Sequence, residues 1–386
     1  IARQQRAQTA WRFELNYQHT RWQFSFNLPR RLQQELYQLD RQVGGERGAD
    51  STVFRGQERN QLLVNSRMEE AIASSQMEGA NTTREVAKEL LRTRRQPRNT
   101  SERMIVNNYR TMRHLREMYQ QPLTVAALLE LQALVTTGTL ENATYAGRLR
   151  DHDGIYVVDH ASSEVVHMPP MHEALPELLS QFCRLANDED EAQNGPYHPV
   201  VKAAILHFLL GFIHPFVDGN GRTARVIFYW YLLRKNYGLI EYMPISRIIK
   251  RSAGQYGRAY LFSEQDQDDL TYFISYQVQV VRQAWQELAE YASRQRKQLG
   301  EVRRLLLTQQ LNERQTQLIQ WLREHPDSTL TIREIQRRFN TAYATARADL
   351  IGLEQLNLLT AGKAGKQKLL YFRADDFDQQ LAKLKG

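Results

Sequence analysis

The chain has 386 residues, of which 42% are hydrophobic and 24% charged, the balance of a soluble globular protein with two or three domains. Its single cysteine, Cys183, excludes an intramolecular disulfide framework and any zinc site built on cysteines, and it fits a reducing compartment. The formal charge of +8 is compatible with anionic partners such as nucleotides or nucleic acid, and equally with a merely basic cytosolic protein.

The hydrophobic pattern argues against membrane insertion. The longest apolar run, Ala203 to Phe216, is interrupted by His207 and His214 and is too short to span a bilayer. The N-terminal residues lack the apolar segment of a secretory signal. We therefore expect a cytoplasmic protein without membrane contact.

The first third of the chain predicts helices. Residues 1–60 are polar and rich in aromatic side chains, and they carry no functional pattern. From about Leu62 to Leu91 apolar residues recur on one helical face, and after a basic break a second helix is expected from about Glu102 to Tyr119. A shorter helix is expected over residues 123–137. We group residues 1–120 as an N-terminal helical region.

A β-hairpin is predicted between Gly147 and Pro170. The runs Ile155–Val158 and Val165–Val166 are β-branched or aromatic and flank a polar turn. This is nearly the only convincing β signal in the first 300 residues, so the fold class is predicted to be mainly α.

Two apolar helices follow, with a short loop between them. His198–Ile213 carries apolar residues at i, i+3 and i+4 and predicts a half-buried helix, with His207 as an ordinary histidine opposite the apolar stripe. Arg222–Lys235 is apolar almost all round, which is typical of a helix at the centre of a domain. We group residues 121–297 as the core that these helices build.

Residues 298–386 predict a winged helix-turn-helix domain. A capping box at Thr331–Glu334 opens the second of three helices, and two short apolar strands flank a Gly/Lys loop. Basic side chains suited to DNA phosphates are Arg337, Arg338, Arg347, Lys363, Lys366 and Lys368. The third helix, Thr341–Gln355, is poor in base-reading residues, so DNA binding and protein docking remain equal alternatives.

The loop between the two apolar helices, "HPFVDGNGRTAR" at residues 214–225, gathers groups that suit phosphate chemistry. A helix N-terminus offers backbone N–H groups without partners and about half a positive charge. Gly219 and Gly221 allow a ligand to approach this backbone closely. Arg222 and Arg225, three residues apart, share one helical face and can hold further phosphate oxygens.

The same loop supplies a carboxylate and a base. Asp218 offers an oxygen for Mg²⁺, which is usually held by one or two carboxylates and the substrate phosphates. His214 has an ordinary pKa suited to proton abstraction near neutral pH. Each residue alone is more often structural, but a purely structural turn does not need all of them in this order.

This stretch resembles the signature of the Fic (filamentation-induced-by-cAMP) family, HPF-x-[DE]-G-N-G-R-x-x-R, at every defining position. The resemblance extends over roughly residues 62–280. It implies a mainly α-helical enzyme that moves AMP from ATP to a hydroxyl side chain of a target protein, with UMP or another nucleotide as the alternative group. The hairpin between Gly154 and Pro169 resembles the family's flap, which can add a strand to the target segment.

By position, the resemblance implies His214 as the general base for a Ser, Thr or Tyr hydroxyl and Asp218 as the Mg²⁺ ligand. Tyr256 is expected to help form the adenine pocket. The residues expected to bind phosphates are Gly219, Asn220 and Gly221 for the α-phosphate, Arg222 for the β-phosphate and Arg225 for the γ-phosphate.

A second motif, "SSQMEG" from Ser74 to Gly79, resembles the family's inhibitory motif, [ST]-x-x-x-E-[GN]. On a helix Ser74 and Glu78 lie on one face, and Glu78 stands at the helix end, where an external cation would stabilise it. We expect Arg225 to be that cation, so that the pair removes the γ-phosphate contact and inhibits transfer. The same glutamate could instead orient water for removing AMP.

Three functions are therefore compatible with the sequence. The leading one is a protein adenylyltransferase inhibited by Glu78, with self-modification and a homodimer as open possibilities. The alternatives are a DNA-binding regulator with a Fic sensor core, using residues 301–386 for DNA, and a hydrolase that removes AMP with Glu78.

Overall fold

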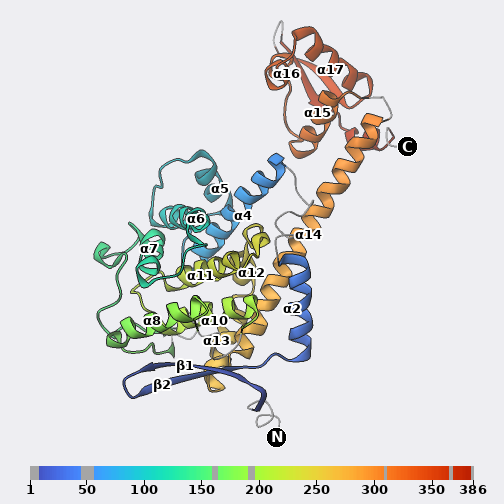
Figure 1. Cartoon of the computed structure of the whole chain (residues 1–386). Helices are drawn as coiled ribbons and strands as arrows, with labels where there is room; N and C mark the ends of the chain where they lie inside the picture. Colours follow the sequence, from blue (N-terminus) through green and yellow to red (C-terminus); the bar gives the residue numbers. More distant parts are fainter. Residues whose placement is uncertain are drawn as a thin grey trace. The chain divides into compact units, whose positions relative to one another are not determined.

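The computed structural model describes residues 8–44, 56–158, 164–189, 196–307, 311–364 and 368–383. The chain forms two compact units, Ile1–Ala289 and Glu290–Gly386 (Figure 1). The boundary falls inside α14, Thr271–Leu307, and not at residue 297 as the sequence predicted. Residues 1–120, expected as a separate region, belong to the same compact unit as the core.

The predicted mainly α fold is confirmed, with three two-stranded antiparallel sheets in the described residues. The first unit contains β1 (Trp11–Tyr17), β2 (Thr20–Phe26), α2 (Arg30–Val43), α4 (Gly56–Met77), α5 (Arg84–Thr93), α6 (Thr100–Met118), α7 (Val125–Thr136), η1 (Ala143–Tyr145), β3 (Val157–Val158), β4 (Val165–His167), η2 (His172–Ala174), α8 (Leu175–Ala186), α10 (Pro199–Ile213), α11 (Asn220–Arg234), η3 (Gly238–Tyr242), α12 (Ile245–Arg251), α13 (Ala253–Gln265) and the start of α14. The second unit contains α15 (Glu313–Glu324), α16 (Ile332–Phe339), α17 (Tyr343–Gln355), β5 (Leu359–Ala364), β6 (Lys368–Arg373) and α18 (Phe377–Lys383).

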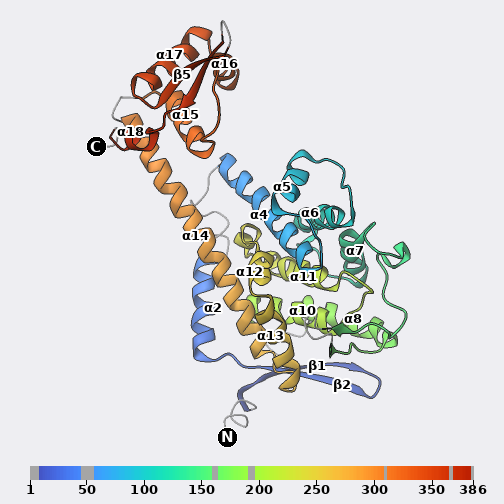
Figure 2. The ribbon, with the colours of Figure 1, turned by 180° about the vertical axis from the view of Figure 1, so that it is seen from behind.

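Helices α10 and α11 form the centre of the first unit (Figures 1 and 2). Every residue of α10 except Pro199 and Gly211 is buried, so the prediction of a half-buried helix was wrong. His207 is also fully buried, and its ring packs against Phe228 of α11 and Phe273 of α14. The polar-looking face of α10 is therefore covered by other helices, which helical periodicity within one segment does not reveal.

The hairpin β1–β2 covers part of the same core, and the sequence analysis missed it. Trp11 pairs with Phe26, and aromatic and polar residues alternate along both strands, which is the period of a half-buried strand. The ring of Phe24 lies 5.2 Å from that of Phe212 in α10 and is fully buried. The alternation of apolar and polar residues in WRFELNY and TRWQFSF is the sequence signal that predicts these two strands.

Helix α4 is held to the core by a buried carboxylate in its middle. Glu70 is 2% exposed, and its Oε2 accepts from the Tyr229 hydroxyl at 2.8 Å and from the Ser246 N–H at 2.9 Å. Burial raises the pKa of Glu70. The helical stretch expected from Leu62 to Leu91 is interrupted, because α4 ends at Met77 and Gly79 has a φ of 90°.

The second unit has the predicted winged helix-turn-helix arrangement. Thr331 and Glu334 form the expected capping box at the start of α16, and Asn340 ends this helix with a φ of 45°. Leu318, Leu350 and Tyr371 lie in the core that joins α15, α17 and β6. The Gly/Lys loop between β5 and β6 includes residues 365–367, which lie outside the described residues.

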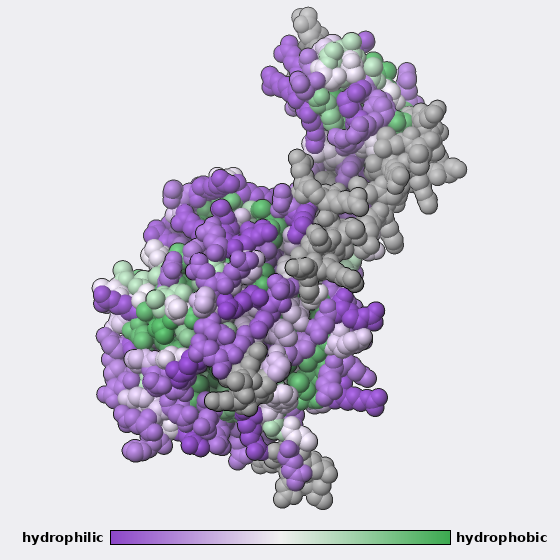
Figure 3. Space-filling model, in the orientation of Figure 1, coloured by the Kyte–Doolittle hydropathy of each residue, from purple (hydrophilic) through white to green (hydrophobic). Residues whose placement is uncertain are grey.

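Hydrophilic residues dominate the face of the first unit seen in Figure 3, with smaller hydrophobic patches between them. Among the described residues, no helix combines the length and the apolar character that crossing a bilayer requires.

We expect Phe24→Ala to lower the free energy of unfolding of the first unit by about 3–5 kcal/mol, because it empties a buried aromatic site against α10. Urea denaturation of the full chain measures this change. Gln23→Ala, at the exposed neighbouring position, is the control and should cost less than about 0.5 kcal/mol. Equal effects of the two substitutions would show that the hairpin does not contribute to the core.

Candidate functional site

The loop between α10 and α11 is held in shape by its own side chains. His214 ends α10 in the left-handed conformation, with φ 47° and ψ 57°, and its N–H donates to Leu210 O at 3.1 Å. Asn220 begins α11, and its side chain accepts from Phe216 N at 3.0 Å and donates to Phe216 O at 2.8 Å. The Asn220 amide, which the sequence expected to bind phosphate, thus bridges the loop at the start of α11.

Both predicted glycines have close neighbours, and Gly219 also has a positive φ. Gly219 has a φ of 88°, and a Cβ there would lie 2.7 Å from Cγ2 of Thr136 in α7. A Cβ on Gly221 would lie 2.4 Å from Oε1 of Glu78. The carboxylate of Glu78 therefore lies directly against the first turn of α11, where a helix favours negative charge.

Arg222 and Asp218 form an ion pair beside this turn. The Arg222 side chain is 0% exposed and donates to Val135 O at 2.8 Å and to the Asp218 carboxylate at 3.0 and 3.1 Å. Asp218 is 46% exposed, and Gln132 of α7 donates to its carbonyl at 3.0 Å. Arg222 therefore orients a half-exposed carboxylate next to the helix N-terminus.

This carboxylate fits the role of a magnesium ligand. Within the described ranges, no cluster of three or more His, Cys, Asp or Glu side chains is arranged to hold a metal by itself. A half-exposed Asp218 just before a helix N-terminus is compatible with the way Mg²⁺ is usually bound, by one or two carboxylates together with substrate phosphates.

The predicted contact between Arg225 and the second motif is present. Arg225 is 2% exposed, and it donates from Nε to Ser74 Oγ at 2.9 Å and from Nη2 to Ser74 O at 3.0 Å. Nη2 also donates to Glu78 Oε1 at 2.8 Å. Burial alone would lower the pKa of Arg225, but Glu78 raises it above its ordinary value, so the guanidinium stays charged.

The His214 side chain is a neutral imidazole. Its Nδ1 lies 3.2 Å from Gly211 O, which can only accept, so Nδ1 carries the proton and Nε2 keeps its lone pair. Burial is the main reason that the pKa of His214 is lowered to about 4, and the nearby cations His167 and Arg150 lower it further. The hydrogen bond to the Gly211 carbonyl acts in the opposite direction and raises it. The imidazole is therefore uncharged at neutral pH, with one proton on Nδ1.

The predicted flap hairpin is present as β3 and β4, paired antiparallel through Val157 and His167. Val158 and Val165 are 41% and 53% exposed, while residues 159–163, the predicted turn, lie outside the described residues. The flap thus presents short, exposed strands beside the loop of His214.

His167 at the end of β4 is a residue to which the sequence assigned no role. Its Nε2 lies 2.7 Å from Phe212 O and its Nδ1 lies 2.9 Å from Glu264 Oε2, so the protonated ring donates to both. Burial lowers the pKa of His167, but Glu264 outweighs burial and raises it above its ordinary value. Glu264 is distant in sequence, so no local motif could have shown this contact.

Tyr256, expected at the adenine pocket, lies in an aromatic cluster between α10, α13 and α14. Its ring centroid is 5.3 Å from that of Tyr260 and 6.0 Å from that of Phe273, and its hydroxyl is 2.9 Å from His207 Nε2. Burial raises the pKa of Tyr256, and the nearby Arg225 opposes that rise. The contact with adenine remains a prediction, while contact with the core is observed.

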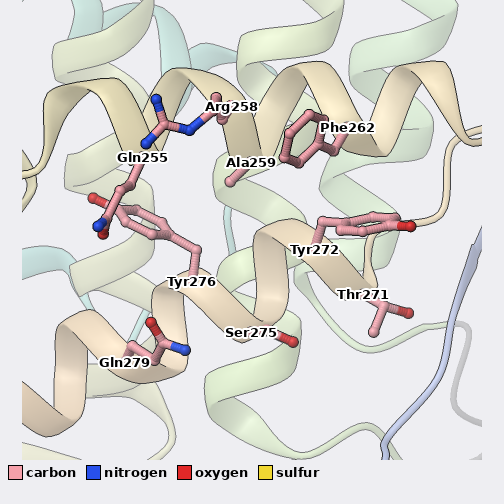
Figure 4. Close-up of a pocket in the computed structure, with 9 residues that line it drawn as sticks. All are labelled: Gln255, Arg258, Ala259, Phe262, Thr271, Tyr272, Ser275, Tyr276 and Gln279. Carbon is pink, nitrogen blue, oxygen red and sulfur yellow. The ribbon is translucent and has the colours of Figure 1, made fainter.

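An open groove of about 490 Å³ lies between α13 and α14 (Figure 4). It is lined by Gln255, Arg258, Ala259, Phe262, Thr271, Tyr272, Ser275, Tyr276 and Gln279. The groove contains no residue of either motif and is separate from the loop of His214. Tyr276 joins its wall to the buried cluster, because its ring lies 5.9 Å from that of Tyr256.

Comparison with known proteins places these features in families. Residues 122–232 match the Fic/DOC family, and residues 314–366 match the DeoR-like helix-turn-helix domain. The protein adenylyltransferase Fic of Drosophila melanogaster is 44% identical over 71 residues, and that of Drosophila grimshawi is 42% identical over 71 residues. The match covers 18% of this chain and 14% of each of these proteins, so the chain spans about one seventh of their length.

The fold is shared with solved structures over a longer stretch. A Fic family protein from Desulfovibrio desulfuricans G20 aligns over 94% of this chain and 99% of its own, with a TM-score of 0.62 and 20% identity. Fic-1 from C. elegans aligns over 68% of this chain and 73% of its own, with a TM-score of 0.54 and 17% identity. At these identities the likeness establishes the fold alone.

We expect His214 to titrate with a pKa of about 4, because its burial disfavours the imidazolium. With the folded pKa below the ordinary value of 6.5, the ring stays neutral as the pH falls through 6 and charges only near 4. Histidine NMR over this range measures the pKa, with His214→Ala identifying the resonance. A midpoint near 6.5 would show that the ring is solvated and contradict the arrangement.

Proposed function

We propose that this chain, in which a Fic/DOC domain precedes a DeoR-like helix-turn-helix domain, is a protein adenylyltransferase. It would transfer AMP from ATP to a Ser, Thr or Tyr hydroxyl of a protein. The observation that carries the proposal is the neutral His214 imidazole, with Nε2 unprotonated, on the loop that leads directly into the first turn of α11.

The phosphates of ATP would lie against the first turn of α11. The backbone around Gly219 and Gly221 would receive the α-phosphate, with Asn220 keeping the loop in shape. Arg222 and Arg225 would hold the β- and γ-phosphates. Mg²⁺ bound by Asp218 would neutralise part of the phosphate charge.

The chemical step needs one base and one good leaving group. His214 Nε2 accepts the proton of the target hydroxyl as that oxygen forms a bond to the α-phosphorus. The bond between the α-phosphorus and the bridging oxygen breaks, and pyrophosphate leaves with both electrons. The target segment would pair with an edge of the flap, which holds its hydroxyl in line for attack.

Glu78 would inhibit this reaction by occupying the place of the γ-phosphate. Its carboxylate lies against Gly221 and binds Arg225, so both the helix end and the guanidinium already face an anion. A hydrogen bond to a charged group contributes about 1.5–3 kcal/mol, which corresponds to roughly 10–100-fold in an equilibrium constant. Glu78 is 26% exposed, so it can move without unfolding its helix.

Removal of AMP is the alternative activity of the same site. The exposed part of the Glu78 side chain would orient a water molecule toward the phosphorus of AMP on a modified protein. The water oxygen would bond to phosphorus as the bond to the protein oxygen breaks, and the proton that the water loses would pass through His214 Nε2 to the leaving oxygen. The two reactions share His214 and the first turn of α11 but differ in their nucleophile and in the role of Glu78, so an activity assay is needed to separate them.

We expect Glu78→Gly to raise incorporation of labelled AMP at least about tenfold, because it frees Arg225 and the first turn of α11. Adding His214→Ala to that variant should abolish incorporation. The measurement is labelled ATP incubated with the full chain, whose own hydroxyls serve as acceptors. Glu85→Gly, at an exposed position of α5, is the control and should leave incorporation unchanged.

Incorporation that persists without His214 would overturn the catalytic proposal. Incorporation that is equal in the native chain and Glu78→Gly would overturn inhibition and leave the catalytic proposal in place. Labelled CTP, GTP and UTP in the same assay decide which nucleotide is used, and a larger signal with UTP would favour uridylyl transfer.

Features of the second unit support DNA binding as an additional function. Its helix-turn-helix match covers α16 and α17, and Arg337, Arg338 and Arg347 are exposed on these helices. Arg338 lies 4.7 Å from the Trp321 ring, which stiffens its side chain without removing its charge.

We expect Arg347→Ala to weaken binding of the full chain to random-sequence duplex DNA, because it removes one contact with a phosphate. The plot of log association constant against log salt concentration should therefore become shallower by about one unit of slope. Fluorescence anisotropy at several salt concentrations measures both. His214→Ala is the control and should leave DNA binding unchanged. A chain that binds no duplex even at low salt would favour a protein-docking role for this unit.

A further inference from the structure

Arg150 lies at the base of the flap and is buried there. Its side chain is 1% exposed, and its backbone N–H donates to Pro215 O at 2.9 Å. Burial lowers the pKa of Arg150, and the neighbouring Asp153 opposes that change. A charged group in such a place is stable only when its donors are well satisfied.

The guanidinium binds three carbonyls from three separate segments. Nε donates to His214 O at 3.0 Å and Nη1 donates to His152 O at 3.1 Å, while Nη2 donates to Pro170 O. His152 precedes strand β3, and Pro170 follows strand β4. One side chain therefore connects both stems of the flap to the backbone of the proposed base.

Asp153 extends this connection. Its Oδ1 accepts from Arg150 Nη1 at 3.1 Å and from the His172 N–H at 2.6 Å, just beyond the second stem. The five N–H donors of an arginine lie in one plane and form a fork that reaches several acceptors at once. A lysine ammonium has no such planar set of donors and cannot replace it. The geometry at position 150 is therefore specific for arginine.

We propose that Arg150 is a positioning residue for the transfer reaction, because it ties both flap stems and the His214 carbonyl to one guanidinium and so sets the distance from a flap-bound hydroxyl to Nε2. This inference rests on the proposed function. The proposed nucleotide contacts come from the first turn of α11, whereas the Arg150 side chain donates its hydrogen bonds to His214, to the two flap stems and to Asp153. Loss of the fork should therefore affect the chemical step and not nucleotide binding.

The first test compares Arg150→Lys with Arg148→Lys, an exposed arginine two residues away, both in the Glu78→Gly background. We expect Arg150→Lys to lower kcat for AMP transfer about 100-fold, the effect of a displacement of about 1 Å, with KM for ATP changed less than about twofold. Arg148→Lys should leave both constants unchanged. Unchanged kcat in Arg150→Lys, or an equal loss in both variants, would overturn the proposal.

The second test does not require activity. Hydrogen exchange of the full chain should become at least about tenfold faster in Arg150→Lys over residues 152–158, 164–171 and 214–217, and remain unchanged in α4. Unchanged exchange in the flap would overturn the proposal. If Glu78→Gly transfers no AMP at all, the proposed function fails, while exchange still decides whether Arg150 holds the flap to His214.

A milder variant covers the case in which Arg150→Lys does not fold. Asp153→Asn removes one charged acceptor and keeps the size of the side chain, so we expect a smaller loss of kcat, about tenfold, and faster exchange at residues 164–171. No change in either measurement would count against the proposal.

Discussion

The packing of α11 against α10 decides where every group of the site lies. Both helices are buried nearly all round, so the loop between them cannot shift without disturbing the core. Asn220 then closes the loop onto Phe216, and the left-handed His214 turns the chain out of α10. A base and a helix N-terminus are thereby brought together by two well-packed helices instead of by a flexible connection.

Buried arginines give this site its electrostatic character. Arg150, Arg222 and Arg225 are each at most 2% exposed, and each is matched by carbonyl or carboxylate oxygens from other segments. Removing such charges from water is costly, so they persist only because their acceptors are in place. Burial is the main cause of the lowered pKa of His214, and Arg150 together with His167 lowers it further.

Helix α4 combines a buried attachment in its middle with a partly exposed glutamate just beyond its end. Glu70 is buried against Tyr229 and Ser246, whereas Glu78 lies beyond the last residue of the helix and is 26% exposed. A change at Glu78 can therefore occur while the rest of α4 stays in contact with the core. The inhibition proposed for Glu78 therefore requires only a local change and no global unfolding.

The sequence alone determined which functional groups the loop contains, because twelve adjacent residues supply them. It also predicted the contact of Glu78 with Arg225, the flap hairpin and the capping box of α16. Only the tertiary structure decided the burial of His207, the neutral state of His214 and the contacts of Arg150 and His167. These properties depend on residues that are distant in sequence and become neighbours only in the folded chain, so a local sequence pattern cannot predict them.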